Sequence, residues 1–159
     1  DKGIIALEID AAGPSIATEA NRLLQSCYGA RFSVELSTLV ATMDGTMKEG
    51  FDIIVHDSHN NDTRPMSALS GGQRVWVNEA IIRSVAVYLA QAGERRYDTL
   101  FTDEVDGALD PERKHAFMAM KLALLKMGYF SREIFITQTP ELLDYADQVI
   151  DLDAQALTT

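Results

Sequence analysis

The residues with the clearest chemical potential lie at a glycine turn near the middle of the sequence. Ser70 is followed by two glycines and Gln73, and the turn opens a run of apolar residues with helical spacing. Serine is a preferred N-cap, and a glutamine three residues later completes a capping box. Because Gly71 and Gly72 have no side chains, the N–H groups at the positive end of the helix dipole are accessible to a phosphate. A capped helix after a flexible turn explains these residues equally well.

Two adjacent acids follow a short apolar stretch further along the chain. Asp103 and Glu104 end a segment that we expect to be a buried strand, and acids at the carboxyl edge of a sheet face the crevice in which α/β folds bind ligands. One carboxylate can hold Mg²⁺, directly or through water, and the next can orient or deprotonate a water. The alternative is an acidic turn, in which Asp110 caps the helix that begins at Pro111.

In this order and at this spacing, the stretches resemble three motifs of the ABC-type ATPases. Residues 70–73 resemble the signature motif, Asp103 and Glu104 the end of the Walker B motif, and residues 108–110 the D-loop. The neighbouring residues 64–68 and 105–107 are most similar to the SMC and SbcC-like branch. That branch comprises coiled-coil ATPases of chromosome organisation and DNA repair.

The resemblance implies a site for ATP and Mg²⁺. The signature residues would contact the γ-phosphate of ATP held on an opposite head, whereas the Walker B acids would complete the site on their own head. Asp103 is expected to hold Mg²⁺ through water, and Glu104 to be the catalytic base. ATP would join two heads, and hydrolysis would release them. The residues expected to bind the nucleotide are Ser70, Gly71, Gly72, Gln73 and Asp110.

Gln138 is a departure from the resembled pattern. In ABC-type ATPases a histidine usually follows the next strand and contacts the γ-phosphate, and the matching position here is Gln138. Parallel pairing would bring it beside Glu104 at the same edge of the sheet. A glutamine can hydrogen-bond a phosphate or a water, but it cannot take up charge near pH 7. We include Gln138 among the expected catalytic residues. Whether it can act as a switch at the γ-phosphate, as the histidine of the family would, stays open.

The sequence contains no G-x-x-x-x-G-K-[ST] motif. In the resembled family this P-loop lies on an N-terminal lobe, separated by a long coiled coil. Residues 1–159 are therefore expected to be the C-terminal half of an ATPase head, inactive alone. We expect a core at 13–153, the end of a coiled coil or a linker at 1–12, and a frayed tail at 154–159.

The resemblance also implies partners. They are the N-terminal P-loop lobe of the same protein, a second head in an ATP-dependent dimer, DNA through the full-length protein, and a nuclease. Two alternatives stay open. The first is a nucleotide-binding subunit of an ABC transporter, although only 69 residues precede Ser70. The second is a non-catalytic ATP-dependent assembly module, which Gln138 favours and the retained Glu104 disfavours.

Composition limits the class of protein. The 159 residues are 47% hydrophobic, enough for one domain with a core. Cys27 is the one cysteine, so no internal disulfide forms and a reducing compartment is expected. With no membrane-length apolar run or visible signal peptide, we expect a cytoplasmic protein, nucleoid-associated if bacterial. The net charge of −10 argues against nucleic-acid binding by this piece alone, apart from a basic patch around Arg95 and Arg96.

The apolar pattern predicts an α/β fold, which the resemblance specifies as the C-terminal lobe of a P-loop NTPase (ABC-type) head. Alternation over 31–57 predicts a small antiparallel meander, and the strand–helix order over 97–152 predicts parallel strands with crossover helices. Residues before Gly13 fit either a strand or the end of a helix. The expected helices run from Pro14 to Gly29, from 71 to 92, from Pro111 to Gly128 and onward from Pro140. The later strands are expected at 97–102, 134–136 and 149–152.

A pair of histidines suggests a second kind of site. His56, Asp57 and His59 stand close together at the end of an alternating segment. A metal site would need further ligands, which the sequence does not make evident. We therefore favour a strand end that runs into the polar loop 60–62.

Overall fold

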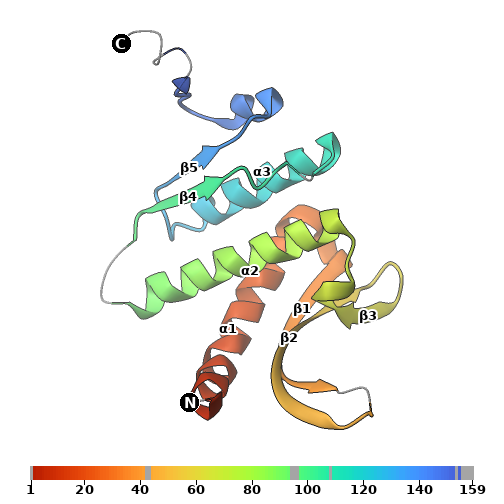
Figure 1. Cartoon of the computed structure of the whole chain (residues 1–159). Helices are drawn as coiled ribbons and strands as arrows, with labels where there is room; N and C mark the ends of the chain where they lie inside the picture. The colour runs from red at the N-terminus through yellow and green to blue at the C-terminus, as the bar shows by residue number, and fades with distance from the viewer. Residues whose placement is uncertain (1, 42–43, 94–96, 108, 153, 155–159) are drawn as a thin grey trace.

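The structure is a computed structural model that describes residues 2–41, 44–93, 97–107, 109–152 and 154. In this part of the chain, helices and two separate sheets form the predicted α/β arrangement (Figure 1). No helix among the described residues is long and apolar enough to cross a membrane. The helices are α1 Lys2–Tyr28, α2 Gly71–Ala92 and α3 Pro111–Lys126, with 3-10 helices η1 Gly29–Arg31, η2 Met66–Ala68 and η3 Pro140–Tyr145. The strands are β1 Phe32–Ala41, β2 Met47–Asp57, β3 Asp62–Pro65, β4 Thr99–Asp103 and β5 Arg132–Ile136.

The predicted antiparallel meander is confirmed, and it contains a third strand. β1 pairs with β2 and β2 pairs with β3, all antiparallel. Val34 lies opposite Val55, and both side chains are buried. The sequence did not predict β3, because residues 60–62 are polar. The chain turns at Asn61, whose φ of 48° lies in the left-handed region that asparagine tolerates, and it then returns along β2.

The second sheet is the predicted parallel pair. β4 and β5 run in the same direction, with α3 as the connection between them. Asp103, the last residue of β4, lies opposite Ile136, the last residue of β5. The loops that follow the two strands therefore meet at one edge of the sheet, as expected from the sequence.

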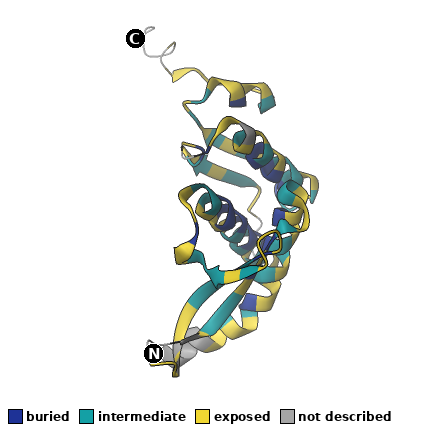
Figure 2. Cartoon of the chain, turned by 90° about the vertical axis from the view of Figure 1, so that its right-hand side faces the viewer, coloured by how far each residue is buried: buried dark blue, intermediate teal, exposed yellow. Residues whose placement is uncertain are grey.

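Buried residues of the helices and of the first sheet form one hydrophobic core, and Figure 2 shows where they lie along the chain. Trp76 of α2 packs edge-to-face against Tyr28 of α1 and Phe117 of α3, with ring centroids 4.1 Å and 5.9 Å away. Aromatic pairs of this kind contribute about 0.5–1.5 kcal/mol each beyond the burial of their area. The core therefore fixes α2, which begins at the glycine turn, against both other helices.

The predicted start of the first helix at Pro14 is wrong. α1 begins at Lys2 and contains Pro14 in its interior. Contacts with β1 on the N-terminal side of the proline explain the continuity. Gly13 is buried with Leu36 3.7 Å from its Cβ position, and the Thr38 hydroxyl donates to the Asp10 carboxylate over 2.8 Å. These contacts fix the turn before the proline, so the helix continues despite the missing N–H.

The predicted last strand at 149–152 is also wrong. Val149 and Ile150 have no strand conformation, and their exposed fractions are 55% and 71%. A strand requires a neighbour to pair with, and the described chain offers none here. The short helix predicted from Pro140 is confirmed as η3. Most of the tail predicted to be frayed, 155–159, lies outside the described residues.

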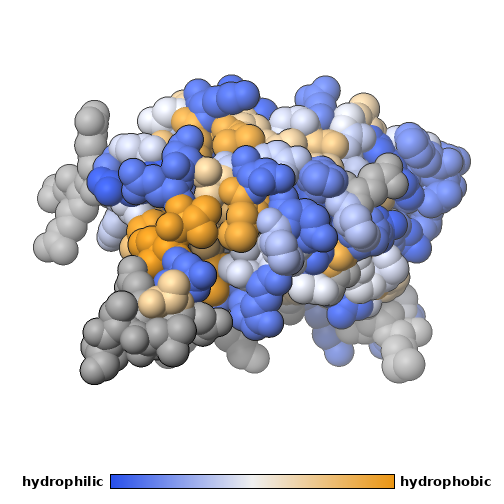
Figure 3. Space-filling model, turned by 90° about the horizontal axis from the view of Figure 1, so that it is seen from above, coloured by the Kyte–Doolittle hydropathy of each residue, from blue (hydrophilic) through white to orange (hydrophobic). Residues whose placement is uncertain are grey.

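One face of the parallel sheet carries exposed apolar side chains. Phe101, Ile134 and Ile136 expose 73%, 47% and 51% of their surface. Successive strand residues alternate between faces, so these three share the face opposite Glu133 and Phe135. Seen from above, hydrophobic side chains gather in a patch on the surface (Figure 3).

Candidate functional site

The glycine turn forms the N-terminus of α2, as the sequence predicts. The Gln73 N–H donates to the Ser70 hydroxyl over 3.4 Å, and the Ser70 N–H donates to the Gln73 side-chain oxygen over 3.2 Å. The predicted capping box is therefore present. Gly71 and Gly72 occupy the first turn, where backbone N–H groups have no acceptor within the helix. The turn can receive an anionic group from outside the chain, and that role stays a prediction.

Arg113 lies against the glycine turn, a contact that the sequence pattern does not reveal. A Cβ atom on Gly72 would stand 2.7 Å from Arg113 Nη1, so a larger residue would displace the guanidinium. The same guanidinium pairs with Asp110, with Nε and Oδ2 3.2 Å apart. A positive charge at a helix N-terminus increases the affinity of that site for anions such as phosphate.

Asp110 caps α3, which is the alternative that the sequence left open. Its Oδ1 accepts from the Arg113 N–H over 2.9 Å, and Pro111 begins the helix. The cap and the ion pair hold the aspartate against Arg113, whose guanidinium lies beside Gly72 of α2. A further role at a nucleotide stays a prediction for Asp110.

Glu104 and Gln138, the two residues predicted to be catalytic, are in contact. The Gln138 side-chain amide donates to Glu104 Oε1, and the Glu104 N–H donates to the Ile136 carbonyl over 3.0 Å. Glu104 has a φ of 45°, in the left-handed region that residues other than glycine rarely adopt. Such a conformation costs about 1–3 kcal/mol and persists only where the surroundings impose it. Here it turns the Glu104 carboxylate toward the loop after β5.

Asp103 is exposed at the end of β4, one residue before Glu104. No group of three or more His, Cys, Asp or Glu side chains that could enclose a metal occurs among the described residues. Mg²⁺ at nucleotide sites usually takes only one or two carboxylates and completes its shell with waters and phosphate oxygens. The donor set at this edge therefore fits Mg²⁺ held with a nucleotide and does not fit an all-protein metal cage.

A buried network of charges lies directly behind this edge. The Arg83 guanidinium of α2 donates two hydrogen bonds to Glu133 of β5, over 2.8 Å and 2.7 Å. Lys121 of α3 donates to Glu133 and, over 2.7 Å, to the hydroxyl of Thr102, the residue before Asp103. The network therefore joins α2 to both strands of the parallel sheet. Sequence reasoning did not find it, because its members are far apart in the chain.

The charges in the network shift one another's pKa values. Burial alone would raise the pKa of Glu133, but hydrogen bonds and positive charges from Arg83 and Lys121 outweigh it and lower the pKa to about 2. Burial lowers the pKa of Lys121, with the charge of Arg83 acting in the same direction. Burial raises the pKa of Glu79, which lies 3.4 Å from Arg83 Nε. Glu133 is thus firmly held in its charged form.

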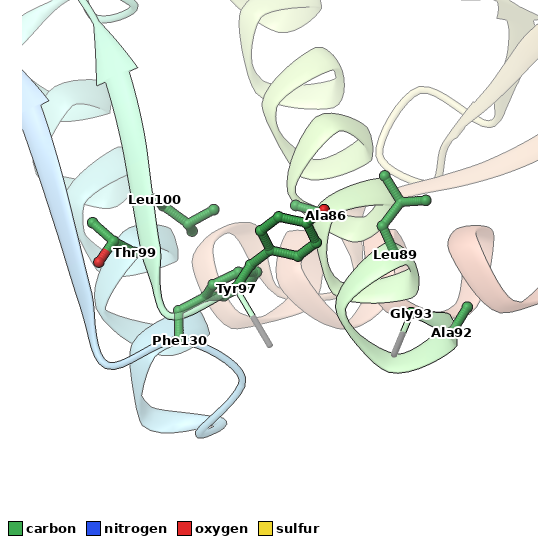
Figure 4. Close-up of a pocket in the computed structure, with 8 residues that line it drawn as sticks. All are labelled: Ala86, Leu89, Ala92, Gly93, Tyr97, Thr99, Leu100 and Phe130. Atoms are coloured by element: carbon green, nitrogen blue, oxygen red, sulfur yellow. The ribbon is translucent and has the colours of Figure 1, made fainter. Parts of the chain in front are cut away.

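An apolar groove of about 700 Å³ lies between the C-terminal half of α2 and β4 (Figure 4). The ring of Tyr97 extends into this space between the two elements. The groove contains none of the residues predicted to bind nucleotide, so it is separate from the candidate site. Its lining residues are Ala86, Leu89, Ala92, Gly93, Tyr97, Thr99, Leu100 and Phe130.

Asp57, in the second candidate cluster, has a structural role. Its buried carboxylate accepts hydrogen bonds from the Arg31 side chain, the His59 N–H and the Asn60 side-chain amide. Burial alone would raise the pKa of Asp57, but these hydrogen bonds lower it overall. His56 contacts the Thr63 hydroxyl over 2.8 Å. Asp57 therefore closes the turn between β2 and β3.

Two sequence predictions fall on residues that the structure does not describe. The expected basic patch at Arg95 and Arg96 lies outside the described residues, as does Ala108, the first residue of the expected D-loop.

Two curated proteins have sequences similar to this chain, and no protein-family model matches it. The SbcC component of nuclease SbcCD from Vibrio cholerae is 38% identical over 69 residues, which cover 43% of this chain and 7% of that protein. Its counterpart from Staphylococcus saprophyticus is 30% identical over 114 residues, which cover 71% of this chain and 11% of that protein. The chain therefore spans about a tenth of the length of the curated relatives it matches.

SMC heads are among the solved structures with the same fold. An SMC ATPase described for ATP-driven dimerisation and DNA-stimulated activation gives a TM-score of 0.65 at 15% identity, covering 95% of this chain and 81% of that one. The SMC head domain from Thermotoga maritima gives a TM-score of 0.55 at 19% identity, covering 92% of this chain and 45% of that one. At these identities the similarity shows the fold alone.

Proposed function

We propose that this chain, which is similar in sequence to SbcC and has the fold of SMC heads, is part of an SMC/SbcC-like ATPase head. It would supply the signature motif, Walker B acids and D-loop of a Mg²⁺-dependent ATPase that acts on DNA. The observation that supports this most directly is the contact between Gln138 and Glu104 beside Asp103, at the carboxyl edge of a parallel sheet. A carboxylate and an amide in this arrangement can hold a water and remove its proton.

In this proposal each side chain has a defined task. Glu104 accepts the proton of the attacking water, and Gln138 orients that water by hydrogen bonding. Asp103 binds Mg²⁺ through a coordinated water, and the ion would supply charge neutralisation at the phosphates when bound. The turn at Ser70 binds the γ-phosphate of ATP held by a second head, where its free N–H groups serve as donors. Asp110 lies at the same interface.

The N-terminal P-loop lobe of the same protein is the proposed partner that completes the site. A two-stranded parallel sheet is not stable alone, and parallel sheets normally have both faces covered. α3 lies against one face here, whereas Phe101, Ile134 and Ile136 are exposed on the other. A further lobe that covers these side chains would supply the missing P-loop. This supports the view that residues 1–159 are the C-terminal half of a head.

The wider role is proposed from the relatives. The curated relatives are components of a nuclease, and one of the SMC ATPases with this fold is described as activated by DNA. We therefore propose that the full-length protein acts on DNA in the cytoplasm, with a nuclease as candidate partner. These relatives favour this function over a role in an ABC transporter. A non-catalytic assembly module stays the second candidate, because Gln138 replaces the usual histidine.

ATP hydrolysis by the full-length protein, with and without DNA, tests the proposal. Replacing the base in Glu104→Gln is expected to reduce the turnover number by about 100-fold or more, in the range that general base catalysis contributes. Glu141→Gln is the matched control, since Glu141 is an exposed acid on η3, and it should retain activity within about twofold of the wild type. Equal activity of Glu104→Gln and the wild type would contradict the proposed chemistry, and an inactive wild type would favour the assembly module.

A further inference from the structure

Asp106 is a buried carboxylate that the proposed chemistry does not use. It lies in the loop between β4 and α3, and 5% of its surface is exposed. One oxygen, Oδ2, accepts hydrogen bonds from the Thr137 hydroxyl over 3.0 Å and from the Thr139 hydroxyl over 2.7 Å. These two threonines are the neighbours of Gln138 on either side. A single buried oxygen thus holds the backbone on both sides of the residue that contacts Glu104.

Lys114 extends this cluster to the first turns of α3. Its ammonium group donates to the Thr139 hydroxyl over 2.7 Å and lies 3.8 Å from Asp106 Oδ2. The Thr139 N–H in turn donates to the Thr137 hydroxyl over 3.0 Å. A buried carboxylate is tolerated only where hydrogen bonds and an opposite charge compensate for its lost hydration, and both are present here.

The cluster has a geometric consequence for the two residues of the proposed chemistry. Glu104 and Asp106 belong to one loop, and Gln138 stands between the two threonines that donate to Asp106. The Gln138 amide donates to Glu104 Oε1. The loop after β4 and the loop after β5 are therefore joined twice, once through Asp106 and once through Gln138. Loss of the first link would leave Gln138 free to move away from Glu104.

We propose that Asp106 is a positioning residue, which holds the Gln138 amide against the Glu104 carboxylate by binding the hydroxyls of Thr137 and Thr139. This inference rests on the proposed function and adds to it a residue that touches neither nucleotide nor water. A displacement of about 1 Å at a reacting group can reduce a rate by about 100-fold. The effect of Asp106 therefore acts on turnover and not on nucleotide affinity.

The test is steady-state ATP hydrolysis by the full-length protein, with nucleotide affinity measured separately. Asp106→Asn retains an oxygen acceptor but loses the charge that faces Lys114, and we expect its kcat to fall by about tenfold with Kd for ATP within about twofold of the wild type. Asp144→Asn, an exposed acid on η3, is the matched control and should have wild-type kcat.

Two further variants separate positioning from a general loss of folding. Thr137→Val removes one hydroxyl at nearly constant volume and should also lower kcat, whereas Thr137→Ser keeps the hydroxyl and should restore it. The combination of Asp106→Asn with Gln138→Ala should be no slower than Gln138→Ala alone, because residues that act as one unit are not additive.

Three outcomes in the Asp106 and Thr137 variants would overturn the inference. They are wild-type kcat in Asp106→Asn, a double variant in which the two effects multiply, and a loss of nucleotide binding in Thr137→Val that equals its loss of kcat. Failure of the proposed function has a different signature, since the wild type itself would not hydrolyse ATP. If the wild type is active and Gln138→Ala is unimpaired, the positioning role fails alone.

Discussion

Glu104 shows most clearly how single residues in this chain are held by distant partners. Its left-handed φ of 45° is supported by the hydrogen bond from its N–H to Ile136 and by the contact of its side chain with Gln138. Both partners follow or end the neighbouring strand. The conformation of one acid therefore depends on the pairing of β4 with β5, so substitutions that weaken this pairing should also affect the proposed base.

Glu133 makes folding sensitive to pH. Its pKa is lowered from 4.5 to about 2 in the folded chain. A carboxyl with a lowered pKa stabilises the fold above its unfolded pKa, and this contribution is lost as the pH falls through the folded value. We expect the free energy of unfolding of the complete head to decrease between pH 4.5 and about pH 2. When the free energy of unfolding is measured with urea, it should decrease less over this pH range for Glu133→Gln than for the wild type.

The controls for this prediction are another network member and an exposed acid. Glu79 has a raised pKa, so its contribution is lost as the pH rises and cannot produce the decrease in acid. Glu141→Gln, at an exposed position, should retain the wild-type slope. Near neutral pH, Glu133→Gln lowers the stability because Arg83 and Lys121 lose a charged partner. The quantity to compare is therefore the slope of the free energy of unfolding against pH. If Glu133→Gln had the same slope as the wild type, Glu133 would not be the source of the decrease in acid.

The sequence predicted the residues whose partners are close in the chain. Ser70 and Gln73 are three residues apart, and their capping box could be read from spacing alone. The pairing of Glu104 with Gln138 required one further assumption, that β4 and β5 are parallel. Arg113 against Gly72 and the charges around Glu133 could not be predicted, because no local period encodes which side chains meet across a core.

Among the elements, α1 and α2 show where local signals are sufficient and where they fail. α2 begins and ends at the predicted residues, because a capping box starts it and Gly93 follows its last turn. α1 passes through Pro14, the residue that was expected to start it. The apolar residues at 149–152 suggested a strand that the described chain does not form. In both failures, contacts with other elements decide the outcome.

Pro14→Ala tests the continuity of α1. A proline in a helix interior costs about 3 kcal/mol relative to alanine, and Pro14 is exposed, so alanine has room at this position. We expect an increase in the free energy of unfolding of the complete head of about 1–3 kcal/mol.

Pro140→Ala is the control for this change, since Pro140 lies in the first turn of η3, where proline is tolerated. It should alter stability by less than about 0.5 kcal/mol. If Pro14→Ala destabilises the head, the helix begins at the proline after all, and the continuous α1 is wrong.

At the scale of the whole molecule, the distinctive feature is the exposed apolar face of the parallel sheet. The parallel sheet presents apolar side chains on one face, and the sequence has no P-loop. Length and composition predicted a domain with a core, and the α/β class followed from the order of elements. The uncovered face could not be predicted from composition, because composition does not say which side chains share one face of a sheet or what packs against it.

Ile134→Lys tests whether the P-loop lobe covers this face. Ile134 is 47% exposed on β5, and burial of a side chain of this size contributes about 1.5–3 kcal/mol to an interface. A lysine there should weaken association of this chain with a separately produced P-loop lobe by about tenfold or more, measured by co-purification and calorimetry. Leu39→Lys, at a 52% exposed position on β1, should bind normally. Equal binding by both variants would mean that the lobe lies elsewhere.

The most direct test of the central claim is the ATP-dependent dimerisation of complete heads that carry Glu104→Gln, measured by sedimentation. If Glu104 is the base and Ser70 contacts ATP on the opposite head, this variant should accumulate as a dimer with Mg²⁺ and ATP and remain monomeric with ADP. Adding Ser70→Arg should abolish the dimer, because the bulky side chain blocks the turn. A Glu104→Gln head that stays monomeric with ATP while binding it would contradict the claim that this chain joins two heads through nucleotide.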